Sequence, residues 1–374
     1  MDLNDLINRI GIKPSTKRNG ALDTYIENSD KKREKLEILL SEFQRVTSDE
    51  SAPTFGGLWL DEQVKGYYNY IYKNINNFDF DLADVAQLTG NEQLYKIIGS
   101  DYTENSKFGL FLSTLINKNI KKGDKVQLIT SIPIHCLFYK LKNPEAYVNI
   151  AGDYLGYDAN NSKIYADKVG YGAGYYIKDC ELYVKKAGDF LGSGAQNSKI
   201  YAVEARADAG NDIDGCELHV KKAGNNLGSG AQNSKIYTDE VEDYAGYNIQ
   251  NCELHVKKAG KLLGYDAKNS KIYADEVEDY AGYNIQNCEL HVKKADEELG
   301  RDAKNSKIYA GEAGINAGYN MENSELFIYK LDENLADSCF KGNNKVYLGE
   351  KSYKEFIQSY PEYINKVKLW EKRD

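Results

Sequence analysis

The chain has 374 residues, a formal net charge of -9 and an unusual content of 31 tyrosines. An acidic surface has the wrong sign for nucleic acid or an anionic membrane, so neither is expected as a partner. No stretch approaches the ~18 apolar residues of a membrane span, and the first residues lack the apolar core of a secretory signal. We therefore expect a cytoplasmic protein.

The first 132 residues predict a mostly α-helical N-terminal domain or cap. Apolar residues at helical spacing form one stripe of Leu36, Leu39, Leu40 and Phe43, and a second of Val64, Tyr67, Tyr68, Ile71, Tyr72 and Ile75. The segment "FGLFLSTLIN" at 108–117 is apolar on all sides. We expect it to be buried against the first coil of the domain that follows.

An internal repeat dominates the rest of the chain. "NSKIY" begins every 36 residues, at Asn161, Asn197, Asn233, Asn269 and Asn305, and related "CEL" or "SEL" segments lie midway between, so the unit has 18 residues. Ten units run without insertion over 151–330, and the degenerate copies "NPEAYV" at 143–148 and "NNKVYL" at 343–348 flank them. "SKIYAD" alternates with period two, as a strand does. The repeat predicts a parallel β-helix of about 12 coils over 133–350.

Stacked coils should exchange large and small residues at inward positions. Leu191 and Ala195 of one unit correspond to Ala209 and Ile213 of the next, as this model requires. Glycine occupies the sixth position of all ten units, and the eleventh holds Asn, Asp or Gly, which tolerate a left-handed backbone. Both positions are interpreted as turns, the eleventh with an asparagine ladder.

Opposite charges alternate at the outward thirteenth position. Its residues are Lys163, Glu181, Lys199, Glu217, Lys235, Glu253, Lys271, Glu289, Lys307 and Glu325. Exposed pairs contribute only about 0.2 to 1 kcal/mol each. Their larger effect is on register, because a slip of one coil places like charges together. This alternation explains why the repeat is 36 residues rather than 18.

Residues 351–374 are predicted to be a C-terminal helical cap. Ser352 and Glu355 have capping-box spacing, and Phe356, Ile357, Tyr360, Ile364 and Val367 give an apolar helical face. A β-helix exposes unpaired strand edges at its ends, which must be covered if the protein is not to polymerise.

The repeated cysteines are interpreted as buried free thiols. Cys180, Cys216, Cys252 and Cys288 occupy the inward twelfth position, where alternate coils carry serine. Successive cysteines lie two coils apart, roughly 9.6 Å, which is too far for a disulfide or a shared zinc ion. No catalytic, cofactor-binding or metal-binding residue is assigned, and no cofactor is expected.

An outward aromatic strip occupies the fifteenth position. It comprises Tyr165, Tyr183, Tyr201, His219, Tyr237, His255, Tyr273, His291, Tyr309 and Phe327. One interpretation is a stacked stripe on a sheet face, and the other is a docking strip for a protein partner. Further tyrosines early in the coil form a belt that could pack edge to face or bind protein or sugar.

The pattern "AGDYLGYDANNSKIYADKVGYGAGYYIKDCELYV" at 151–184 resembles the GXGXG β-helix domain, which is found in the large polypeptide of glutamate synthase and in formylmethanofuran dehydrogenase. The resemblance covers about 151–330 and implies a right-handed β-helix that serves those enzymes as a scaffold. Asp2 stands where the glutamate synthase amidotransferase has its nucleophilic cysteine. No activity is therefore carried over.

We expect a non-enzymatic scaffold or protein-interaction module, with a protein partner and possible homo-oligomers. One alternative is a carbohydrate-binding or carbohydrate-active β-helix protein, although ten coils without insertion leave no loop for catalytic carboxylates. Another is an acyltransferase-like left-handed β-helix, because "LGSGAQ" fits the hexapeptide pattern once per coil. A polymer-forming β-helix is disfavoured by the predicted caps.

Overall fold

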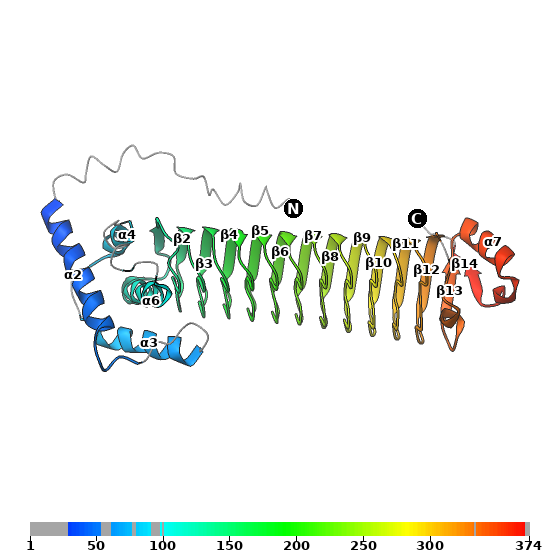
Figure 1. Ribbon diagram of the computed structural model, residues 1–374, viewed down its shortest axis with the longest axis horizontal. Coiled ribbons are helices and arrows are strands. Elements are labelled where there is room, and N and C mark those ends of the chain that lie inside the picture. Colours follow the sequence, from blue (N-terminus) through cyan, green and yellow to red (C-terminus); the bar gives the residue numbers. More distant parts are fainter. Residues whose placement is uncertain are drawn as a thin grey trace. The chain divides into compact units, whose positions relative to one another are not determined.

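The computed structural model describes residues 29–53, 61–76, 80–90, 98, 101–332 and 334–370, with the side chains of 29–33 and 61 left undescribed. The chain is mainly β and folds as a parallel β-solenoid of about 14 turns with few helices (Figure 1). About 12 coils were expected from the repeat. Within the described ranges, no helix is long and apolar enough to cross a membrane.

The strands follow one another in chain order and pair in parallel. They are β1 (Lys125–Leu128), β2 (Glu145–Ile150), β3 (Lys163–Lys168), β4 (Glu181–Ala187), β5 (Lys199–Ala205), β6 (Glu217–Ala223), β7 (Lys235–Val241), β8 (Glu253–Ala259), β9 (Lys271–Val277), β10 (Glu289–Ala295), β11 (Lys307–Ala313), β12 (Glu325–Leu331), β13 (Lys345–Leu348) and β14 (Val367–Leu369). The degenerate flanking copies form β2 and β13, as expected. The repeat did not predict β1 or β14.

The chain divides into two compact units, which are described separately. The N-terminal unit comprises residues 1–173 and 183–185, and the C-terminal unit comprises 174–182 and 186–374. In the C-terminal unit the register between neighbouring strands is 18 residues, for example Glu217 opposite Lys235. The coils therefore stack equivalent positions on one another.

Left-handed residues build the corner of each coil. In the C-terminal unit, Tyr244, Gly246 and Asn248 have φ values of 63°, 67° and 54°. Alternation of left- and right-handed residues turns successive N–H groups toward opposite neighbours. The N–H of Tyr244 donates to Lys261 of the following coil, whereas the N–H of Gly246 donates to Leu227 of the preceding one, at 2.9 and 2.8 Å. Hydrogen bonds between coils thus continue through the turns.

The sixth position needs glycine for a second reason. A Cβ atom on Gly246 would lie 2.6 Å from a methyl group of Leu254, the inward residue that packs over the turn. The predicted turn role of the eleventh position is also confirmed, because Asn233 and Asn251 have positive φ values and their amides join across 3.4 Å. Left-handed backbone and close packing together explain the glycine at the sixth position.

The solenoid interior is apolar and filled by complementary volumes. Leu191 and Ala195 of one coil, and Ala209 and Ile213 of the next, are each at most 1% exposed. Full burial of such a side chain stabilises the fold by roughly 1.5 to 3 kcal/mol. The predicted exchange of large and small residues is therefore confirmed.

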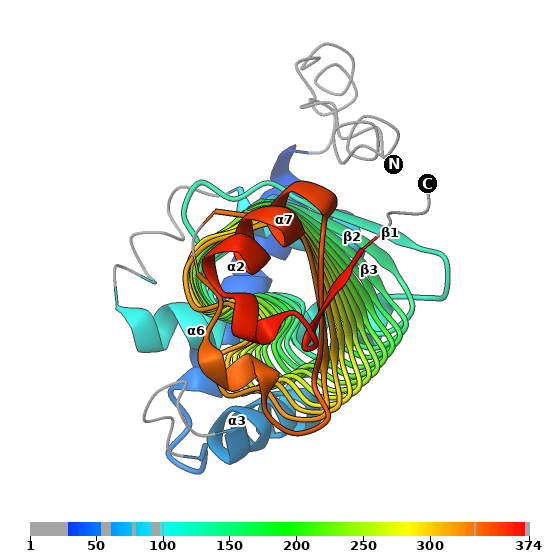
Figure 2. The same cartoon turned by 90° about the vertical axis from the view of Figure 1, so that its right-hand side faces the viewer.

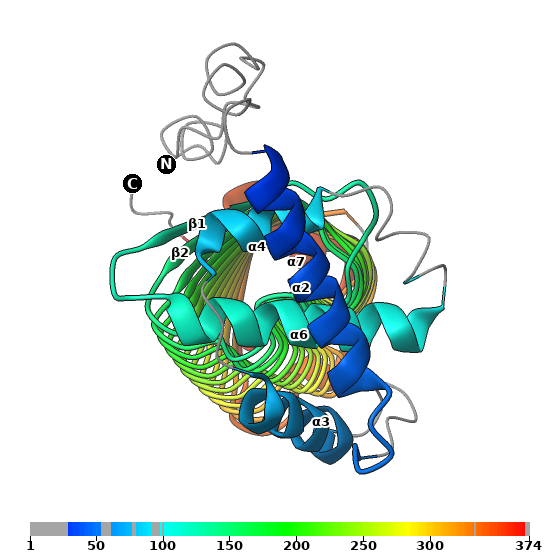
Figure 3. The same ribbon diagram turned by 90° about the vertical axis from the view of Figure 1, so that its left-hand side faces the viewer.

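Helices cover the start of the solenoid in the N-terminal unit (Figure 3). They are α2 (Ser29–Thr47), α3 (Asp61–Asn74), α4 (Leu82–Thr89) and α6 (Tyr102–Asn119). Helix α6 contains the apolar segment 108–117 and is buried along most of its length. Ser113 fixes it to the adjacent turn, because its hydroxyl accepts from Tyr139 N–H at 3.1 Å and donates to Cys136 O at 3.0 Å. The expected burial against the first coil is confirmed.

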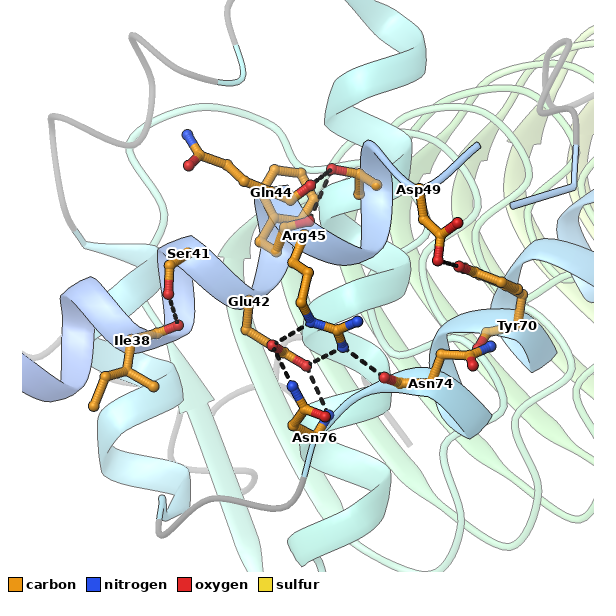
Figure 4. Close-up of polar contacts among 11 residues, drawn as sticks. Ile38, Ser41, Glu42, Gln44, Arg45, Asp49, Tyr70, Asn74 and Asn76 are labelled. Carbon is orange, nitrogen blue, oxygen red and sulfur yellow. Dashed lines mark hydrogen bonds and ion pairs between the residues drawn. The ribbon is translucent and has the colours of Figure 1, made fainter. Parts of the chain in front are cut away.

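A polar clamp joins α2 to the end of α3 (Figure 4). The Glu42 carboxylate, only 6% exposed, accepts two hydrogen bonds from Arg45, at 2.8 and 2.6 Å. It also accepts from Asn76 N–H at 2.6 Å, while Arg45 donates to Asn74 O at 2.6 Å. Burial alone would raise the pKa of Glu42, but the hydrogen bonds from Arg45 and Asn76 outweigh it and lower the pKa.

The C-terminal end is closed by helix α7 (Glu350–Ser359), which contacts β12, β13 and β14 (Figure 2). The predicted capping box at Ser352 is wrong. The N-cap residue is Gly349, and Ser352 lies inside the helix, where its hydroxyl accepts from Leu331 N–H at 2.9 Å. The single apolar helical face is also wrong, because Pro361 begins a separate 3-10 turn and Val367 lies in β14. Proline cannot continue the preceding helix.

Replacement of Glu42 by glutamine tests the polar clamp. One acceptor oxygen becomes an amide donor that faces Arg45 or Asn76, so Glu42→Gln should lower the free energy of unfolding by about 2 kcal/mol at neutral pH. Denaturant unfolding followed by helical circular dichroism measures the loss. Ser41→Ala, on the same helix with an exposed local hydrogen bond, is the matched control and should change stability by no more than about 0.5 kcal/mol.

The same pair of proteins has an expected pH dependence. Because the folded-state pKa of Glu42 is lowered, its contribution is present above the unfolded pKa and is lost as the pH falls through the folded value. The stability difference between the native protein and Glu42→Gln should therefore shrink in acid. A constant difference down to the lowest pH at which both proteins fold would contradict this account.

Candidate interaction surfaces

The predicted aromatic strip is a continuous stack. In the C-terminal unit, nine rings from Tyr201 to Tyr347 stack one per coil, with neighbouring centroids 4.4 to 5.1 Å apart and planes within 18° of parallel. Tyr165 and Tyr183 stack in the same way in the N-terminal unit, at 4.9 Å. The stacked stripe is therefore confirmed, and all ten predicted residues are partly exposed.

The stack is longer than the sequence repeat indicated. Tyr347 continues it in β13, and Tyr147 occupies the equivalent position in β2, opposite Tyr165. Both residues lie in degenerate copies, but each stands two residues after the charged thirteenth position. That spacing, Glu145 to Tyr147 and Lys345 to Tyr347, is the signal that could have identified them.

Each histidine of the stack is held by a glutamate of its own strand. His219, His255 and His291 place Nε2 2.7 Å from the carboxylate two residues earlier, on the same strand face. The hydrogen bond from His255 lowers the pKa of Glu253, and nearby lysines act in the same direction. These pairs were not predicted, although the spacing in "ELH" places both side chains on one face.

Charge pairs flank the stack on both sides. At the thirteenth position, Lys199 and Glu217 approach to 3.7 Å, and Lys345 and Glu325 to 2.6 Å. Further along the strands, Lys257 pairs with Asp239 at 2.6 Å. The predicted ladder is therefore present between the coils described here, and the strand face alternates in sign along the solenoid.

The cysteines have a role beyond filling the core. Each side chain of the twelfth column accepts the backbone N–H of the preceding coil: Cys216 N–H donates to Ser234 Oγ at 3.0 Å, and Ser234 N–H to Cys252 Sγ at 3.4 Å. All six cysteines are free and buried, as predicted. Burial raises the pKa of Cys216 to about 11, so its thiol stays protonated.

The tyrosine belt contains a second, shorter stack in the C-terminal unit. Tyr247, Tyr265 and Tyr283 stack at 5.3 and 5.0 Å. The guanidinium of Arg301 then takes the place of the next ring, 5.5 Å from the centroid of Tyr283 and 4.8 Å from that of Tyr319. The part of the belt in these coils is thus packed as a stack, and its exposed edges are phenol groups.

A polar depression of about 430 Å³ adjoins this second stack. Its lining combines amides, carboxylates and one ammonium group, from Tyr283, Asn284, Asp302, Lys304, Asn320, Met321 and Glu322. Asn320 donates to Asp302 at 2.6 Å, and Lys304 lies 3.6 Å from Glu322. The charges nearly balance, so the depression offers donors and acceptors without a strong field.

Within the described part of the chain, no three His, Cys, Asp or Glu side chains come together as a metal site. Comparisons with models of protein families, with curated proteins and with solved structures find no match to this chain. The candidate surfaces are therefore the aromatic stack of the strand face and the depression beside the tyrosine belt.

The twelfth column makes a sharp stability prediction. Cys252→Ala removes the acceptor for Ser234 N–H, so it should lower the free energy of unfolding by about 2 kcal/mol. Cys252→Ser keeps an acceptor at a position where alternate coils already have serine, and should be close to the native protein. Denaturant unfolding measures both. Equal losses in the two variants would show that volume, and not the hydrogen bond, is what the column supplies.

Proposed function

We propose that this protein is a non-enzymatic scaffold whose strand face binds a protein partner. The observation that carries the proposal is the stack of nine half-exposed rings from Tyr201 to Tyr347. Each ring is fixed by its neighbours, so little side-chain entropy is lost when a partner contacts the ring edges. Tyrosine is also enriched in interface hot spots.

The charges beside the stack would give the surface its specificity. Lys199, Glu217 and the following pairs alternate in sign with a period of two coils. A partner that matches this alternation gains complementary contacts, whereas one shifted by a single coil meets like charges. The N-terminal helices, whose Ile38 and Tyr72 are 42% and 43% exposed, are proposed as a second contact surface.

The repeat itself is proposed to be of the GXGXG β-helix type. The positive φ at the recurring sixth-position glycines and the inward residue packed over each one support this assignment. In that type of domain the solenoid is a scaffold, which agrees with an interior filled by side chains and a surface tiled by paired residues.

Affinity capture tests the protein-binding proposal. A tagged full chain should retain a partner from extract of its own cells, and a double variant Tyr237→Thr and Tyr273→Thr, which keeps β-forming residues in the strands, should lose it. The matched control is Tyr247→Ser with Tyr265→Ser, because serine occupies that column at Ser193 and Ser229. Both variants should melt within a few degrees of the native protein. A partner lost only by the control would move the contact to the tyrosine belt.

A second candidate function is carbohydrate binding at the polar depression. Its balanced amides, carboxylates and ammonium suit a neutral polyhydroxy ligand, which needs many donors and acceptors and little net charge. Because the same columns recur in each coil, an extended polysaccharide could contact several coils at once.

Glycine substitutions test this second candidate without breaking the turn. Gly194 and Gly230 stand in the same left-handed column as Asn284 and Asn320, so Asn284→Gly with Asn320→Gly should fold normally. Affinity electrophoresis through neutral polysaccharides should then show retardation of the native protein and about tenfold weaker binding of the variant. Asn248→Gly, outside the depression, is the control. Equal mobility of all three proteins in every polysaccharide would exclude the site.

A further inference from the structure

We propose that His135 is a proton-controlled latch, which holds helix α6 on the first coils of the N-terminal unit while its imidazole is neutral and releases the helix when the ring is protonated. The inference is independent of the partner or ligand proposed above. It rests on the hydrogen bonds and close contacts around this one side chain.

The hydrogen bonding assigns the tautomer of His135. The backbone N–H of Asp153 donates to Nδ1 of His135 at 2.8 Å. Nδ1 must therefore carry a lone pair, and the proton of the neutral ring is on Nε2. Protonation would place a second N–H against the N–H of Asp153, so a hydrogen bond would become a contact between two donors.

The ring cannot turn away from this conflict. A Cβ atom on Gly152 would lie 2.6 Å from Nδ1, which shows how closely the backbone approaches one face of the imidazole. The ring of Tyr102 in α6 packs on His135 with centroids 4.2 Å apart. Gly109 of α6 leaves no room either, because a Cβ there would lie 1.7 Å from the carbonyl oxygen of His135. Relief requires that α6 and the coil separate.

The ionisable groups that face the imidazole are the Tyr102 hydroxyl from α6 and the Asp153 carboxylate from the next coil, with the buried Cys136 thiol beside it in the chain. Asp153 lies 3.5 Å from Nδ1 and favours the cation. Burial opposes the cation more strongly, so the pKa of His135 is lowered. Asp153 already accepts from the Tyr102 hydroxyl at 3.0 Å and from Tyr171 N–H at 2.8 Å, which fixes the carboxylate in place.

The sign of the effect follows from linkage. A histidine whose folded-state pKa lies below its unfolded value stabilises the folded state fully above the unfolded pKa, about 6.5. That stabilisation is lost as the pH falls from there toward the folded value. For one proton, the equilibrium constant for release of α6 should rise about tenfold per pH unit across this window.

Two measurements on the full chain test the latch. The protein has four histidines, so NMR titration of their ring protons, assigned by single substitutions, should give His135 a pKa clearly below those of His219, His255 and His291. Hydrogen exchange of α6 amides, corrected for the intrinsic pH dependence, should lose about tenfold in protection per pH unit below about 6.5. Strands β7 to β10 should keep their protection.

Matched variants separate the latch from general acid sensitivity. His135→Gln can accept the Asp153 N–H but does not titrate, so it should remove the acid loss in α6. His255→Tyr, which places in the stack the residue of its neighbours, should leave the loss unchanged. A His135 pKa at or above those of the stacked histidines, or α6 protection that does not fall in acid, would overturn the proposal. The titration of the native protein decides even if His135→Gln does not fold.

Discussion

The structure depends on hydrogen bonds that join each coil to the next through the turns as well as the strands. A strand ladder alone would pair only seven residues of each 18-residue unit, as in β8. The remaining backbone groups would stay unsatisfied in a stacked interior, at a cost of several kcal/mol per coil. The left-handed residues at the corner solve this, because each one aims its N–H at a neighbouring coil. The unit therefore cannot change length by one residue without misaligning every column.

This fixed register explains why the same residue types recur. Stacking places identical positions about 4.8 Å apart, so any column must tolerate itself or a chosen complement. Like charges cannot be repeated there, and the chain alternates Lys199 with Glu217. Two large side chains cannot be repeated inside, and it alternates Leu191 with Ala209. Rings can be repeated, because offset stacking is favourable, and the strand face keeps an aromatic residue in every coil.

Most of the solenoid could be predicted because the repeat states its rules ten times. Period-two alternation identified the strands, and the column residues identified which side faces inward. The sequence could not reveal β1 and β14, because a strand of three or four residues outside the repeat carries too little pattern. Val367 fitted a helical face as well as a strand, and only Pro361 argued for the break.

The candidate site shows the same division. The stack was predictable from one column, but its links to other columns were not. The bond from His255 to Glu253 joins two columns that the repeat shows separately, and the acceptor role of Cys252 appears only when a backbone group of the preceding coil is placed beside it. The latch at His135 was out of reach for a further reason. Its geometry depends on Gly109 and Gly152, whose close approaches to His135 involve segments that lie outside the repeat.

The C-terminal end bears on whether the strand face serves one molecule or a fibre. Lys368 stands in the ring column next to Tyr347, with its ammonium 5.8 Å from the ring centroid. Trp370 then folds back beside the stack, 5.7 Å from Phe327. Another chain that continued the stack would have to bury the lysine charge against its own first ring, at a cost of several kcal/mol. A charged residue on an edge strand is a common protection against edge-to-edge pairing. The end of the stack is therefore built to stop, which favours recognition along its side over growth from its tip.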